Sequence, residues 1–67
     1  PDFLGCVNGL SVAIELKASQ ADMDKSRASI QNYILFQINR AGGYAAYMYP
    51  ENADEVIDEI CERAFLM

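Results

Sequence analysis

The feature that most constrains this chain is the dipeptide Asn8-Gly9, which lies between two short runs of alternating side chains. Asn-Gly favours a type I′ turn because both central residues of that turn need a positive φ, which asparagine tolerates and glycine adopts freely. A two-residue turn also fixes the register of the flanking strands, so we expect an antiparallel hairpin. Counting outward from the turn gives the expected pairs: Val7 with Leu10, Cys6 with Ser11, Gly5 with Val12, Leu4 with Ala13, Phe3 with Ile14 and Asp2 with Glu15.

Alternation along the two runs gives this hairpin one apolar face and one mixed face. The apolar face carries Phe3, Gly5, Val7, Leu10, Val12, Ile14 and Leu16. The mixed face carries Asp2, Leu4, Cys6, Ser11, Ala13, Glu15 and Lys17. A slip of one residue would mix the faces, so the turn and the hydrophobic pattern predict the same register. We expect the apolar face to be a core and the mixed face to be a site.

The expected register places the carboxylates of Asp2 and Glu15 opposite each other on the mixed face. Opposed residues of an antiparallel pair have Cβ atoms about 5 Å apart, and like charges there destabilise a sheet. A divalent cation would remove this repulsion, and hard oxygen ligands suit Mg²⁺ or Mn²⁺. We expect the ligands to be Asp2, Glu15 and the backbone carbonyl of Leu16. Lys17, on the same face, would orient the attacking water or stabilise charge on a phosphate, as in a metal-dependent nuclease.

The rest of the sequence predicts a loop, two helices and a strand. Residues 18–24 are small and polar and follow neither periodicity, which is typical of a loop. Apolar residues at helical spacing predict a helix over 25–41, capped by Asp24 or Ser26 and ended by Gly42-Gly43. A β-prone run over 44–49 is halted by a proline, and a last helix covers about 53–65.

Each predicted helix has an apolar stripe that we expect to face inward. The first stripe consists of Ile30, Tyr33, Ile34, Ile38 and Ala41, widened by Leu35 and Phe36. The second consists of Val56, Ile57, Ile60, Cys61, Ala64 and Phe65. Asn52, followed by Glu55, resembles a capping box at the start of the last helix. Together these elements predict an α/β fold, in which the hairpin and the later strand form a mixed sheet with helices packed against it.

Size and charge limit the classes of protein to consider. A chain of 67 residues buries only a marginal core, so we expect a single domain that is an internal fragment of a longer protein. The net charge of −5 argues against a general nucleic-acid binder, because phosphate contacts need clustered cations. Six of the ten acids lie between Glu51 and Glu62, however. The cations nearer the expected site are Lys17, Lys25, Arg27 and Arg40.

Cysteine spacing and hydropathy indicate the compartment. Cys6 and Cys61 lack the spacing of metal ligands, and we expect buried thiols in a reducing environment. No apolar run is long enough to cross a bilayer, and no signal peptide is visible. We therefore expect an intracellular protein, in the cytoplasm of a bacterium or of a virus-infected host.

The residues Pro1-Asp2 and Glu15-Leu16-Lys17 match the pattern of the PD-(D/E)XK nuclease superfamily, in which Pro-Asp precedes Asp/Glu-X-Lys on the next strand. Three further features make the chain similar to the VRR-NUC family, the virus-type replication-repair nucleases, from Pro1 to about Ile60. They are a helix carrying Gln31, the corner Ala41-Gly42-Gly43-Tyr44 and the segment Asp54-Glu55-Val56.

This resemblance implies a restriction-endonuclease-like core over residues 1–67 that lacks the family's first helix, whose glutamate also serves the metal. It implies Asp2 and Glu15 as metal ligands and Lys17 as the catalytic lysine. It also implies that Gln31 is the family's helix glutamine near the site. The activity implied is Mg²⁺- or Mn²⁺-dependent hydrolysis of phosphodiester bonds in DNA, during replication or repair, with branched or flapped DNA as candidate substrates.

Other readings of the same residues stay open. Lys25 and Arg27 are candidate DNA contacts, although basic residues at a helix start are usually solvated. Three tyrosines of the predicted strand are candidates for stacking on bases, although alternation favours core or interface positions: Tyr44, Tyr47 and Tyr49. The alternative to an enzyme is a non-catalytic interaction or assembly module that keeps the fold. A weaker one is a metal-independent protein-binding domain that uses the tyrosines. An exposed hairpin edge also predicts a homo-oligomer.

Overall fold

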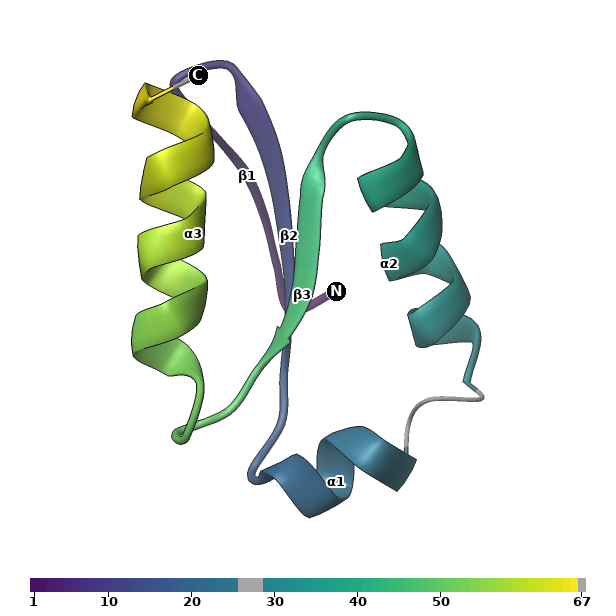
Figure 1. The fold of residues 1–67 in the computed structure, drawn as a ribbon. Helices are drawn as coiled ribbons and strands as arrows, with labels where there is room; N and C mark the ends of the chain where they lie inside the picture. Colours follow the sequence, from purple (N-terminus) through teal and green to yellow (C-terminus); the bar gives the residue numbers. More distant parts are fainter. Residues whose placement is uncertain (26–28, 67) are drawn as a thin grey trace.

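The computed structural model describes residues 1–25 and 29–66 as a small sheet between helices (Figure 1). The elements are β1 (Phe3–Val7), β2 (Leu10–Leu16), α1 (Gln20–Lys25), α2 (Ile30–Arg40), β3 (Tyr44–Met48) and α3 (Ala53–Phe65). The strands form one sheet in the order β1-β2-β3, with α3 on one face and α2 on the other. The prediction of an α/β fold with a mixed sheet is therefore confirmed.

The hairpin of β1 and β2 has the predicted register. The strands pair antiparallel from Val7 with Leu10 outward to Phe3 with Ile14. Both turn residues have positive φ, 49° at Asn8 and 86° at Gly9, as a type I′ turn requires. The turn is also tied to the far end of the chain, because Asn8 Nδ2 donates to the Ala64 carbonyl of α3 at 2.6 Å.

The β2 and β3 strands are parallel, with Glu15 beside Tyr47 and Leu16 beside Met48. A parallel pair needs a crossover connection, which α1 and α2 supply (Figure 1). The pairing continues one residue past β2, because Lys17 N donates to the Met48 carbonyl at 2.9 Å. Gly42, with φ of 99°, closes the C-terminal end of α2 as predicted and leads the chain into β3.

Two asparagine side chains cover the outer edge of β3. Asn39 accepts from Ala45 N at 2.9 Å and donates to the Ala45 carbonyl at 2.8 Å. Asn52 donates to the Tyr47 carbonyl at 3.0 Å and accepts from Tyr49 N at 2.8 Å. These backbone groups alternate with the Met48 carbonyl that faces β2, so they are the groups an edge strand leaves unpaired. Side-chain amides therefore take the place of a further strand.

Hydrophobic residues pack on both faces of the sheet, so the mixed face, which was expected to be a site, also carries part of the core. Beneath α3 the buried cluster is Leu10, Val12, Ile14, Tyr44, Val56 and Ala64. Beneath α2 a smaller cluster consists of Ala13, Leu35 and Ala45, with Ile38 and Tyr47 against it. The small side chains of Ala13 and Ala45 let α2 approach the mixed face, so the candidate site occupies only the remaining part of that face.

Helix boundaries differ from the prediction between β2 and α2. The predicted loop over 18–24 contains α1, whose N-terminus is capped by Ser19 Oγ accepting from Asp22 N at 3.3 Å. None of the α1 residues is fully buried, so this helix needs no apolar stripe. The hydrophobic periodicity of the sequence therefore could not predict it. The cap of α2 is Ser29, which accepts from Asn32 N at 3.3 Å, whereas Asp24 belongs to α1. Ser26 lies outside the described residues.

The predicted cap of α3 is also corrected. Asn52 does occupy the N-cap position, but its side chain makes no capping hydrogen bond. Both ends of its amide bind the backbone at the end of β3 instead. The bounds of α3, Ala53–Phe65, agree with the prediction.

The inward stripes are narrower than predicted because each helix meets the sheet along one line. On α2 the residues over the sheet include Leu35 and Ile38, whereas Ile30, Tyr33 and Phe36 are 74%, 62% and 57% exposed. On α3, Val56 and Ala64 are buried, whereas the residues exposed to solvent are Ile57, Cys61 and Phe65. Cys6 and Cys61 are free and exposed, so the expectation of buried thiols was wrong. No helix in the described part of the chain is long and apolar enough to span a bilayer.

An apolar groove of about 370 Å³ runs between the flank of α3 and the sheet. Its lining residues are Phe3, Val7, Val12, Ile14, Leu16, Met48, Ile57, Ile60 and Cys61. Phe3 and Leu16 belong to the predicted core face but are 51% and 56% exposed. They lie at the margin of the sheet, beyond the line along which α3 packs.

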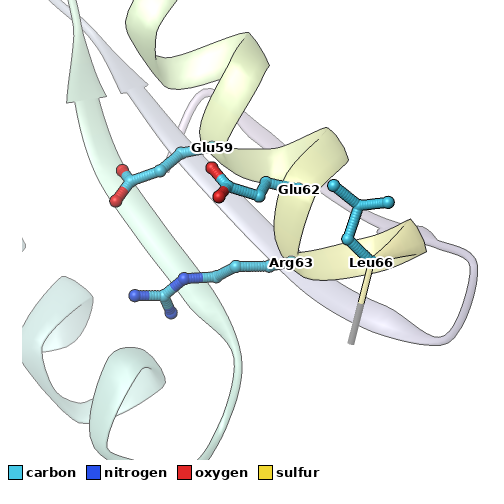
Figure 2. Close-up of a pocket in the computed structure, with 4 residues that line it drawn as sticks. All are labelled: Glu59, Glu62, Arg63 and Leu66. Atoms are coloured by element: carbon cyan, nitrogen blue, oxygen red, sulfur yellow. The ribbon is translucent and has the colours of Figure 1, made fainter.

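A polar cluster links β3 to α3 at the other end of the core. Tyr44 is buried, and its hydroxyl donates to Glu59 Oε2 at 3.0 Å. The Arg63 guanidinium lies 5.3 Å from the centre of the Tyr44 ring, and Figure 2 shows Glu59 and Arg63 extending from α3 in the same direction. Burial, followed by the hydrogen bond and the negative charge of Glu59, raises the pKa of Tyr44 to about 12.

We expect Asn39→Ala to lower the free energy of unfolding by about 1–3 kcal/mol, because the edge groups of Ala45 lose both partners. Chemical denaturation followed by circular dichroism measures the change. Gln37→Ala, two residues earlier on α2, is the matched control and should have little effect. Equal stabilities of the two variants would contradict the role assigned to Asn39.

The raised pKa of Tyr44 predicts a loss of stability at alkaline pH. The unfolded chain releases the phenolic proton near pH 10, whereas the folded chain releases it near pH 12. Stability from the neutral phenol is therefore fully present below about pH 10 and is lost as pH rises toward 12. The stability difference between the wild type and Tyr44→Phe should shrink over this range in urea titrations. Tyr33→Phe, at an exposed position, is the control, and a constant difference for Tyr44→Phe would refute the shift.

Candidate metal centre

The candidate site lies at the end of β2, where β1 begins. The regular pairing of β1 with β2 ends at Phe3 and Ile14. Asp2 has no paired residue on β2, but its N–H donates to the Ile14 carbonyl at 2.9 Å. Asp2 Oδ2 accepts from Leu16 N at 2.7 Å, so this carboxylate turns toward the backbone of β2. The predicted pair of Asp2 with Glu15 is therefore not part of the register, and the hairpin brings the Asp2 carboxylate to the Leu16 amide instead.

The backbone N–H and carbonyl of Leu16 both face the β1 side of β2, where Asp2 lies. In a β-strand the N–H and the carbonyl of one residue point to the same side, and the Leu16 N–H binds Asp2. The Leu16 carbonyl, the third predicted metal ligand, therefore faces the β1 side of β2. The Leu16 side chain is 56% exposed and belongs to the apolar groove on the other face.

Glu15 is the most enclosed acid of the candidate site. Its side chain is 12% exposed, and Oε1 is buried with no hydrogen-bond partner. The amino group of Pro1 lies 3.7 Å from this oxygen, an ion-pair distance. A buried carboxylate oxygen that lacks a hydrogen-bond donor is costly, because folding removes its water without replacing it. The Pro1 amino group offsets part of this cost, and a cation bound at Glu15 Oε1 would offset more of it.

The direction in which α2 runs indicates how far along the sheet Gln31 lies relative to Glu15. Since β2 and β3 are parallel, α2 returns from the end of β2 to the start of β3, with Leu35 packed on Ala13 and Ala45. Gln31 precedes Leu35 by one turn, about 6 Å along the helix. Glu15 follows Ala13 by two residues, about 6.6 Å along the strand. Helix and strand geometry thus place Gln31 at the level of Glu15.

Gln31 shares the unusual environment of Glu15. Its Oε1 is also buried without a hydrogen-bond partner. These two oxygens are the buried, unpartnered side-chain atoms found over residues 1–25 and 29–66. Two acceptors without donors at the same level of one face are unlike a solvated surface, where water would satisfy both.

Lys17 extends the site beyond Glu15. Alternation places both side chains on the α2 face, and Lys17 Nζ lies 5.8 Å from the centre of the Tyr47 ring. Tyr47 is the neighbour of Glu15 in the parallel pairing. The sequence indicated Tyr47 as a candidate for stacking on bases but not as a neighbour of Glu15, because only the parallel register of β2 and β3 brings the two together.

The oxygen atoms named above are of the types that magnesium and manganese ions prefer. Two carboxylates, an amide oxygen and a backbone carbonyl are hard ligands, and an ion that keeps several waters needs only a few of them. No group of three acidic, histidine or cysteine side chains forms a candidate metal cluster in the described residues. The fit therefore depends on the two carboxylates together with the uncharged oxygens of Leu16 and Gln31.

The remaining predicted contacts are outside this cluster. Lys25 is exposed at the last residue of α1, and Arg27 lies outside the described residues. The acids between Glu51 and Glu62 lie on α3 or in the turn before it. Because α3 packs on the face opposite α2, the acidic surface is separated from Glu15 by the sheet.

Comparison with protein-family models, with curated proteins and with solved structures finds no match for this chain.

Manganese binding at this site predicts a thermal shift that depends on Glu15. At a Mn²⁺ concentration about tenfold above its Kd, we expect the Tm of the wild type to rise by about 5–10 °C. Glu15→Gln removes the charged ligand and should abolish the shift. Glu62→Gln, exposed on α3, removes the same charge elsewhere and should leave it intact. Differential scanning calorimetry with and without Mn²⁺ provides the measurement, and an equal shift in Glu15→Gln would exclude Glu15 as a ligand.

Proposed function

We propose that this chain is part of a metal-dependent DNA endonuclease with a restriction-endonuclease-like core of the VRR-NUC type. The observation that carries the proposal is a buried oxygen without a hydrogen-bond partner on each of Glu15 and Gln31, two of the residues that the family resemblance implies for the site. A divalent cation would satisfy both oxygens, and divalent cations assist phosphodiester hydrolysis. Among the described residues, Glu15 Oε1 has an ion-pair contact of 3.7 Å with the Pro1 amino group, and Gln31 Oε1 has no hydrogen-bond donor.

Each residue has a distinct role in this proposal. The carboxylates of Asp2 and Glu15 and the Leu16 carbonyl hold the ion, and Gln31 helps to position the reacting groups. When bound, the ion supplies Lewis acidity and lowers the pKa of a coordinated water. The ammonium of Lys17, on the Glu15 side of the sheet, orients that water or stabilises the negative charge that develops on the phosphate.

The proposed substrate is DNA, branched or flapped, in an intracellular setting. Lys25 is an exposed cation on the helix that follows β2, and Arg27 comes two residues later in the sequence. Phosphate contacts by such residues position DNA without reading its sequence. The acids of α3 lie across the sheet from Glu15, so their repulsion acts least on DNA at the α2 face.

A second candidate function, a non-catalytic assembly module with the same fold, is favoured by the exposed apolar surface. The groove beside α3 is lined entirely by apolar side chains and Cys61, and the outer side of α2 exposes Ile30, Tyr33 and Phe36. Contiguous apolar surface of this kind is typical of interaction sites. It also supports self-association into a homo-oligomer, which is compatible with either function.

Lys17→Ala should lower the rate of Mn²⁺-dependent cleavage of flapped or branched DNA by about 10²–10³-fold, the usual effect of removing a group that stabilises transition-state charge. Gel-based initial rates on end-labelled substrates measure the change. Arg40→Ala is the matched control, because it removes one positive charge at the far end of α2 from Gln31.

Equal rates for the wild type and Lys17→Ala would contradict the proposed role of the lysine. If the wild type cleaves none of these substrates and sediments as more than one chain, the assembly module is the better description.

A further inference from the structure

Lys17 has a fixed backbone position but a flexible side chain. Its N–H donates to the Met48 carbonyl at 2.9 Å, which joins it to β3 one residue beyond the end of β2. Four rotatable bonds separate this anchored backbone from the ammonium, and their freedom is worth about 2 kcal/mol of rotamer entropy. A lysine that acts at a metal centre therefore needs a contact that selects one position for Nζ.

The Tyr47 ring supplies such a contact. Nζ lies 5.8 Å from the ring centre, within the range in which the negative face of an aromatic ring attracts a cation. The ring is itself held in place, because Tyr47 packs against the cluster beneath α2 and pairs with Glu15 in the parallel ladder. A rigid ring next to Glu15 thus holds the ammonium on the Glu15 side of the sheet.

A ring also differs from a carboxylate as a partner for this lysine. An ion pair between Lys17 and Glu15 would use the oxygen that the proposed metal requires. In the described part of the chain Lys17 makes no ion pair, and Glu15 Oε1 accepts no hydrogen bond. The aromatic face therefore fixes the ammonium of Lys17 without using Glu15 Oε1, whose ion-pair contact is the Pro1 amino group at 3.7 Å.

We infer that Tyr47 is the positioning residue for Lys17 and sets the place of its ammonium through the aromatic ring. This inference rests on the proposed nuclease function for its effect on rate, but the contact itself is independent of that function. The ring, and not the hydroxyl, carries the role, because the ammonium lies over the ring face. A phenylalanine at position 47 should therefore keep the ammonium of Lys17 in place, whereas an aliphatic residue should not.

Two variants and one control separate the ring from the hydroxyl. Tyr47→Leu removes the ring and keeps an apolar side chain under α2, and Tyr47→Phe removes only the hydroxyl. Tyr33→Leu, at the exposed outer side of α2, is the control for loss of a tyrosine ring. We expect Tyr47→Leu to lower kcat about threefold to tenfold with KM for DNA unchanged, and Tyr47→Phe and Tyr33→Leu to match the wild type.

The contact has a spectroscopic signature that requires no activity. A ring face shifts nearby protons upfield, so the ε-CH₂ resonance of Lys17 should move to that of the exposed Lys25 in Tyr47→Leu and stay shifted in Tyr47→Phe. In the reciprocal experiment, Lys17→Met should move the Tyr47 ring resonances, which tests the contact even where Tyr47→Leu does not fold. Unchanged Lys17 resonances in Tyr47→Leu, or equal effects of leucine and phenylalanine, would overturn the inference. A wild type that shows the NMR contact but no Mn²⁺-dependent cleavage would instead refute the proposed function.

Discussion

The two-residue turn at Asn8-Gly9 is the constraint on which the rest of the molecule depends. Both residues adopt positive φ, and this geometry allows one register between β1 and β2. That register brings Asp2 to the Leu16 amide and sends Val12 and Ile14 to one face and Ala13 and Glu15 to the other. Asn8 further binds the end of α3, so the turn also anchors the helix that covers the larger core.

The packing of α2 on Ala13 and Ala45 covers the face of the sheet that carries the candidate metal centre. Methyl side chains at these positions allow the helix to lie close to the sheet, and Leu35 fills the space between them. One turn of α2 before Leu35, Gln31 has a buried Oε1 without a hydrogen-bond partner, as Glu15 has on β2. Tight packing and unsatisfied polarity are therefore adjacent, which is unusual for a purely structural region and typical of functional sites.

The two edges of the sheet differ in whether side chains bind their outer backbone groups. The outer backbone groups of β3 are bound by Asn39 and Asn52, which replace a fourth strand at that edge. At the other side of the molecule, Leu4 is 72% exposed and the groove beside β1 is apolar. The exposed apolar surface thus lies at β1, α3 and the outer side of α2. The edge of β3 is instead covered by the two asparagine side chains.

Turn chemistry and alternation act over a few residues, so the sequence alone was enough for the hairpin, for the pairs from Val7 with Leu10 to Phe3 with Ile14, and for the last helix. The expected pair of Asp2 with Glu15 is replaced by a hydrogen bond between Asp2 and the Leu16 amide. Only the tertiary structure decided which residues of α2 face the sheet, that α1 is helical, and that Tyr47 lies beside Glu15. Periodicity gives the width of an apolar stripe but not the line of contact, since that line depends on what the partner surface allows. For α2 that surface is the pair of alanines, on which Leu35 packs while Ile30 and Tyr33 stay exposed.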